Sequence, residues 1–268
     1  MRLTDPIDKL AGGDIDATAY RALRVGLAVL VLLRITTFGE SFFPLDHHGW
    51  VDGLEWWSAS DVSSPALRFP LWLPVPLRAE RALLVLRLGA AVTMLVGLAP
   101  RTSSLLVALS GWTLMNADPF RYFHHLHLLY LACALVALCP SGWRLARAPR
   151  WPMQLVRLQV LLVYGAAGLG KCNEAWLSGE TLTRLHELGL LGTLPDVSFR
   201  VLAIAITATE LALIPLLAWR RTRWLGIALA LVLHAGLDIQ MMVSTFGATM
   251  ILLVSGFLPL WQRPAAPR

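Results

Sequence analysis

Long apolar segments, separated by short polar or basic ones, most constrain how this chain can fold. The 268 residues are 56% hydrophobic and only 15% charged, whereas a soluble domain carries about 25% charged residues. A helix that crosses a bilayer needs about 20 mainly apolar residues. We therefore predict an all-α fold, a polytopic transmembrane helical bundle of about eight spans. The predicted spans are 20–38, 79–99, 103–117, 125–138, 153–170, 199–219, 224–239 and 241–261.

Polar segments flank this apolar part of the chain. Residues 1–18 hold four aspartates and are too polar for the apolar core of a secretory signal peptide. We expect a polar leader over 1–18, one transmembrane domain over 19–262 and a polar tail over 263–268. Prolines interrupt residues 39–78, and the tryptophans of this loop are typical of the headgroup region.

The arginines predict the orientation of the bundle. Short cytoplasmic loops of membrane proteins are enriched in Lys and Arg, and here arginines concentrate at 144–150 and 220–223. We therefore expect both termini in the cytoplasm, a location in the inner (plasma) membrane, and the end of the bundle that holds Lys171 on the extracytoplasmic side. The net charge of +6 does not indicate nucleic acid as a partner, because the arginines lie in loops between apolar spans.

Lys171 is one of only two lysines in the chain and follows the span at 153–170. Arginine stays charged at any useful pH, whereas a desolvated lysine can act as a base. The alternative role is a lysine that reaches from a helix end to the membrane surface. The run from Gly165 to Lys171 also begins like a nucleotide-binding loop, but Cys172 replaces the Ser or Thr of that motif. Small residues such as Gly168 either allow close helix packing or leave room for a flat ligand.

Histidines and charges inside the spans form a second group of candidates. His124 and His127 are three residues apart, but apart from Asp118 no carboxylate or cysteine completes a ligand set, so we expect no metal. His234 and Asp238 are four apart and share a helix face. We expect structural pairing for the other intramembrane charges, with Glu210 paired to an arginine. These charges are Arg34, Arg87, Arg157 and Glu210.

Three motifs together resemble one family. They are VYGAAGLGK at 163–171 followed by Trp176 and Gly179, DPFRYFHHLHL at 118–128, and LHAGLDIQ at 233–240. In their order and spacing they resemble the membrane domain, called the HTTM domain, of vitamin K-dependent gamma-glutamyl carboxylase. Bacterial relatives share this domain, and the chain resembles a bacterial homologue that lacks the large extracytoplasmic domain of the animal enzymes.

This resemblance implies an enzyme and a set of site residues. Lys171 matches the base that deprotonates reduced vitamin K, His125 matches the histidine that assists carboxylation, and His234 lies in the late histidine helix. We expect these three side chains to line one outward-facing cavity. The resemblance further assigns cofactor binding to Gly168, Trp176, His124 and Tyr164.

The same resemblance implies cofactors and partners. The cofactor is a reduced vitamin K-type quinone such as menaquinol, used with O2 and CO2. The partners are membrane lipids, the lipophilic quinone, and a secreted peptide or a separate substrate-binding protein. The implied reaction is oxygen-dependent epoxidation of the quinone, coupled to carboxylation of a peptide glutamate.

Two other functions stay open at this point. One is a non-catalytic membrane scaffold or peptide-maturation partner that keeps the fold. The other is a quinone-dependent oxidoreductase that makes no carboxylated product. The chain ends soon after the last predicted span, so we do not expect the extracytoplasmic domain that helps the animal enzymes to hold their peptide.

Overall fold

A computed structural model describes residues 13–37, 77–116, 124–189, 191, 198–241 and 245–258. In this part of the chain almost all regular structure is helical. Two three-residue strands, β1 (Asp14–Asp16) and β2 (Arg147–Pro149), are the exceptions among the described residues, and the sequence did not predict them. The chain divides into two compact units, one formed by Ala17–Ala148 and the other by Pro149–Arg268 with Met1–Asp16.

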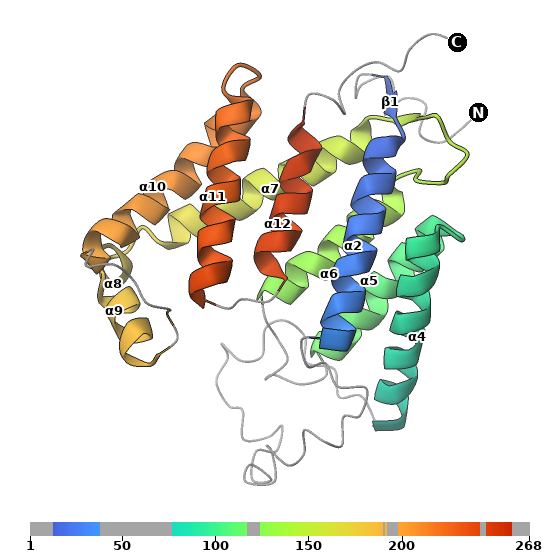
Figure 1. The fold of residues 1–268 in the computed structure, drawn as a ribbon, viewed down its shortest axis with the longest axis horizontal. Coiled ribbons are helices and arrows are strands. Elements are labelled where there is room, and N and C mark those ends of the chain that lie inside the picture. The colour runs from blue at the N-terminus through green and yellow to red at the C-terminus, as the bar shows by residue number, and fades with distance from the viewer. Residues whose placement is uncertain are drawn as a thin grey trace. The chain divides into compact units, whose positions relative to one another are not determined.

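The unit Ala17–Ala148 is built from four helices that contact one another in a ring. They are α2 (Thr18–Thr37), α4 (Leu77–Val96), α5 (Pro100–Asn116) and α6 (His124–Leu138). The helix α2 packs on α4, α4 on α5, α5 on α6, and α6 on α2. Figure 1 shows α2 in blue and α4 in blue-green.

Two buried arginines of this unit donate hydrogen bonds to neighbouring helices. Arg24 donates to the carbonyl oxygens of Met94 and of Leu95, the latter at 3.1 Å. Arg87 donates to the Tyr130 hydroxyl at 2.6 Å. A buried guanidinium needs hydrogen-bond acceptors, and the contact with Tyr130 fits the structural role expected for Arg87, whereas Arg24 was not singled out in the sequence.

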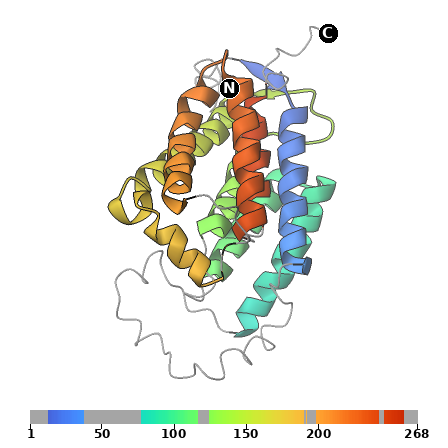
Figure 2. The ribbon, with the colours of Figure 1, turned by 60° about the vertical axis from the view of Figure 1, so that its left-hand side comes forward.

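The second unit contains the longer apolar helices. Its elements are α7 (Trp151–Gly170), α8 (Glu174–Leu177), α9 (Glu180–Glu187), α10 (Phe199–Ala218), α11 (Arg223–Met241), α12 (Phe246–Val254) and the 3-10 helix η4 (Ser255–Phe257). The helix α10 packs on both α7 and α11, while α12 packs on α11 and α7. In Figures 1 and 2, α8 and α9 lie beside the start of α10.

Each predicted span coincides with a helix. The last one is shorter than predicted, because α12 begins at Phe246 and its continuation η4 ends at Phe257. Among the described residues, α7 and α10 are each long and apolar enough to cross a membrane. These two helices support a helical membrane domain, and the count of eight spans stays a prediction.

Candidate functional site

One face of α7 carries three of the residues singled out in the sequence. Tyr164, Gly168 and Lys171 are spaced by four and then three residues, so they follow one another along the same side of the helix. Tyr164 and Gly168 are buried. Lys171 comes directly after the last helical residue and forms the C-cap of α7, where its side chain is half-buried. This side of the helix therefore carries the phenol of Tyr164 and, about 10 Å further along the axis, the amine of Lys171.

Lys171 forms an ion pair with Glu210 of α10. Its Nζ lies 2.8 Å from each of the two carboxylate oxygens of Glu210. The side chains of the lysine and the glutamate are 22% and 7% exposed. A pair this well removed from water depends on its partners, because each charge alone would be costly to desolvate.

This pairing corrects the expectation that Glu210 binds an arginine. The partner is a lysine 39 residues away in sequence, at the end of the preceding long helix. An acidic side chain inside an apolar helix requires a cation or a proton. The rarity of lysine in the chain was the signal that singled out Lys171, but it did not identify the partner.

The segment after Lys171 places Trp176 beside the ion pair. Asn173 caps α8 by accepting a hydrogen bond from the Trp176 backbone N–H at 3.0 Å, and its own amide donates to the Gly170 carbonyl at 2.8 Å. The Trp176 indole N–H donates to the carbonyl of Ala203 in α10 at 3.2 Å. The indole is thereby fixed with its ring centre 5.3 Å from Lys171 Nζ, a cation–π distance.

Gly168 lies where α7 and α10 approach each other closely. A Cβ atom at this position would come within 2.7 Å of the Leu211 side chain. Of the two roles that the sequence allowed, the structure shows helix packing, and ligand binding at Gly168 stays a prediction. Gly170 differs, because a Cβ atom there would meet nothing within 4 Å.

Gly179 fixes the path of the chain from α8 into α9. Its φ of +86° lies in the left-handed region, and an added Cβ atom would approach the backbone N of Arg200 to 2.5 Å. The glycine of the Lys-Trp-Gly motif therefore lets α9 start against the first turn of α10.

Gly179→Ala should lower the free energy of unfolding by about 2 kcal/mol or more, since left-handed strain of about 1–2 kcal/mol adds to a backbone clash. Gly189→Ala is the matched control, because Gly189 also has a positive φ of +68° but open space around it. Thermal unfolding of both purified variants measures the difference. Equal losses would show that the contact with α10 contributes nothing.

Tyr164 and His234 form a second pair in the same unit. The Tyr164 hydroxyl and His234 Nε2 are 2.9 Å apart, and both side chains are buried. The ring of Phe246 packs edge-on against the imidazole at 5.4 Å. His234 Nδ1 is also buried and has no hydrogen-bond partner among the described residues. One ring nitrogen of the imidazole is therefore enclosed by the protein without a hydrogen bond from the described residues.

Asp238 lies on α11 like His234, but its hydrogen bond is to α12 and not to α7. Its Oδ1 accepts a hydrogen bond from the backbone N–H of Gly247 at 3.1 Å, at the first turn of α12. A Cβ atom on Gly247 would collide with this carboxylate. Asp238 and Gly247 thus join α11 to α12.

The structure brings together part of the predicted site. Lys171 lies with Trp176, and Tyr164 lies with His234. His124 and His125 form the start of α6, and their side chains lie outside the described part. One cavity shared by Lys171, His125 and His234 therefore stays a prediction. In the described part of the chain, no three His, Cys, Asp or Glu side chains are grouped to hold a metal ion.

The comparison with protein families gives a match over most of the chain. The model of the HTTM domain matches residues 16–261. Neither the curated proteins nor the solved structures gave a match.

Proposed function

The chain belongs to the HTTM domain family, and from this premise we propose that it is an integral membrane enzyme resembling the vitamin K-dependent gamma-glutamyl carboxylases. The family match confirms the resemblance drawn from the three motifs. In this proposal Lys171 takes a proton from a reduced quinone within the membrane. The observation that carries the proposal is the pairing of this lysine with Glu210 at 2.8 Å in a largely dehydrated position.

The Lys171–Glu210 pair suits a residue that must act as a base. At 2.8 Å, Nζ and a carboxylate oxygen are joined by a hydrogen bond along which a proton can pass from Lys171 to Glu210. The pair has zero net charge in both forms, and removal from water disfavours the form with separated charges. With the proton on Glu210, Lys171 presents a neutral amine that accepts the proton of a ligand hydroxyl.

Other side chains of this unit fit a flat ligand that carries hydroxyl groups. Trp176 offers an indole face next to Lys171, and the side of Gly170 is open. The orphaned Nδ1 of buried His234 supplies a hydrogen-bonding atom on the same unit. When bound, a reduced quinone supplies the acidic hydroxyl group and the reducing equivalents for reaction with O2.

The Tyr164–His234 pair has a positioning role in this proposal. The hydrogen bond to Tyr164 fixes the imidazole ring through Nε2, so Nδ1 keeps one direction. The Phe246 ring shields it from water. The role of His125 in the carboxylation step rests only on its match to the family motif.

The proposal is tested by supplying purified protein in lipid nanodiscs with menaquinol and O2. We expect protein-dependent oxidation of menaquinol and formation of its epoxide, detected by mass spectrometry. Oxidation without epoxide would favour the oxidoreductase, and loss of quinone binding altogether would favour the scaffold. Addition of glutamate-containing peptides and labelled CO2 then tests carboxylation.

The proposed orientation makes its own prediction. With eight spans and cytoplasmic termini, the α9 end of the molecule is extracytoplasmic and the turn before α11 is cytoplasmic. Arg184→Cys and Arg221→Cys place a thiol at an exposed position on each side. The background is Cys172→Ser, because Cys172 is the exposed native cysteine of the described residues. A membrane-impermeant maleimide on intact cells should label position 184 and spare 221, and the reverse pattern would refute the orientation.

A further inference from the structure

A basic cavity lies at the end of α7 opposite to Lys171. Its volume is about 470 Å³, in the range of small-molecule sites. Arg150 and Lys171 flank the 20 residues of α7 and are therefore about 30 Å apart, and Leu161, the lining residue nearest to Lys171 along the helix, is still about 15 Å away from it. The cavity is therefore separate from the proposed catalytic site. Its lining residues are Arg150, Gln154, Arg157, Leu158, Leu161, Ala218, Arg220, Arg223 and Phe257.

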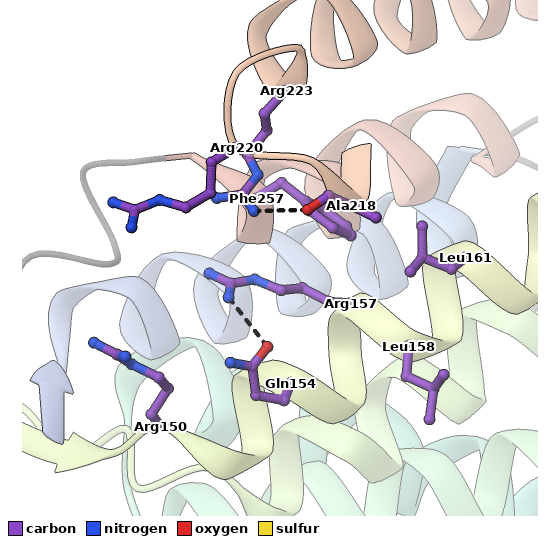
Figure 3. A pocket seen from close by; sticks show the side chains of 9 residues that line it. All are labelled: Arg150, Gln154, Arg157, Leu158, Leu161, Ala218, Arg220, Arg223 and Phe257. Carbon is purple, nitrogen blue, oxygen red and sulfur yellow. Dashed lines mark hydrogen bonds between the residues drawn. The ribbon is translucent and has the colours of Figure 1, made fainter. Parts of the chain in front are cut away.

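Arginines make up most of the polar lining of this cavity. Four of its lining residues are arginines, and none of the described residues that line it is acidic. In Figure 3 the guanidinium groups of Arg150, Arg157 and Arg220 lie on the same side of the view. Like charges gathered in a concave site attract an anion, because the protein walls focus the field.

Two of the arginines are held in place by the protein. Arg157 Nε donates to the Gly256 carbonyl at 2.9 Å, and Arg223 Nε donates to the Leu217 carbonyl at 3.1 Å. Both guanidinium groups lie near the ring of Phe257, at 5.7 and 6.0 Å from its centre. Fixed guanidinium groups lose little side-chain entropy when they bind phosphate oxygens.

The other end of the cavity is apolar. Leu158 and Leu161 follow Arg157 along α7 toward its middle, and Figure 3 shows both on the side away from the arginine cluster. Leu158 is 50% exposed. A ligand that fills the cavity thus needs an anionic head and an apolar continuation along the helix.

We infer that this cavity binds a phosphate-bearing ligand, with its phosphoryl group on the arginines and its apolar part along Leu158 and Leu161. The phosphoryl group can come from an anionic phospholipid or from a soluble phosphate. The apolar continuation and the position at a helix end favour the phospholipid, since basic pockets between membrane helices bind such headgroups.

The test measures binding to the purified full-length protein by calorimetry. The probes are dihexanoyl-phosphatidylglycerol, dihexanoyl-phosphatidylcholine and inorganic phosphate. Arg220→Gln should weaken binding of phosphatidylglycerol about fivefold. Arg221→Gln is the matched control, because it changes the neighbouring arginine of the same turn, which does not line the cavity. Equal effects of the two variants would overturn the site.

A second pair of variants separates the sources of the phosphoryl group. Leu158→Gln should weaken binding of the phospholipid but not binding of inorganic phosphate. Leu162 is an exposed leucine outside the cavity, so Leu162→Gln should weaken binding of neither probe. Binding of inorganic phosphate that depends on Arg220, without binding of the lipid, would support the phosphate site and assign a soluble ligand.

Gln154→Glu keeps the arginines and adds a negative charge beside Arg157, with which Gln154 already forms a hydrogen bond at 3.1 Å. The change opposes anion binding without removing a contact, so folding should be retained. Unchanged affinity for every probe in this variant would overturn the proposal. Menaquinol oxidation is measured separately, because this inference does not depend on the catalytic role of Lys171.

Discussion

Lys171→Arg should reduce menaquinol oxidation about a hundredfold or more, the usual contribution of a general base. The guanidinium keeps a positive charge for Glu210 and can form a bidentate pair with its carboxylate. It cannot release a proton at neutral pH, so the variant keeps the ion pair and loses only the base. The measurement is the initial rate of menaquinol oxidation by equal amounts of nanodisc-embedded wild-type and variant protein.

The chain offers a matched control for this change. Lys9 is the other lysine of the sequence, and it belongs to the predicted leader, so Lys9→Arg should leave the rate unchanged. Thermal unfolding of Lys171→Arg should resemble that of the wild-type protein. A fully active Lys171→Arg variant would show that Lys171 is an anchoring cation and not a base.

The helices were predictable because the membrane restricts what a backbone can do. Within the bilayer every peptide group must find its hydrogen bond inside its own segment or a closed sheet. Runs of apolar residues therefore became helices, as α7 and α10 illustrate, with α7 starting on a proline at its first turn and ending at Gly170. The turn before α11 was equally predictable, since arginines and a threonine interrupt the apolar pattern there.

The partners across helices were not predictable to the same degree. The Lys171–Glu210 contact depends on how α7 and α10 are rotated about their axes, and both helices are apolar around most of their circumference. The packing of Gly168 against Leu211 fixes this rotation, but sequence spacing within one helix does not contain it. The Tyr164–His234 contact joins residues 70 positions apart and was not predicted from the sequence for the same reason.

The short strands and the buried Arg24 were missed on different grounds. Three residues in β1 are too few for an alternating pattern to be recognised. Arg24 lies in the second turn of α2, inside the predicted span 20–38, and was not singled out in the sequence. Its carbonyl acceptors lie on α4, so only tertiary packing reveals that its charge is buried.

Glu210→Leu and Lys171→Met should each destabilise the protein, and the lysine change should cost more. Removing one partner of a buried ion pair costs about 3–5 kcal/mol, because the remaining charge has no counter-ion. Lys171→Met leaves a carboxylate that is only 7% exposed, whereas Glu210→Leu leaves an ammonium group on a side chain that is 22% exposed. The lysine reaches water more easily, so the loss for Glu210→Leu should lie at the lower end, about 3 kcal/mol.

The double variant Lys171→Met, Glu210→Leu isolates the pair. It leaves no unpaired charge, so it should be more stable than either single variant, as replacement of a whole buried ion pair often proves neutral. Glu180→Gln supplies the control, since Glu180 pairs with Arg184 at 3.3 Å while both side chains are more than half exposed. That change should alter the free energy of unfolding by only about 0.5 kcal/mol. If the single variants at 171 and 210 cost no more than Glu180→Gln, the pair is hydrated in solution and cannot carry the proton exchange proposed for Lys171.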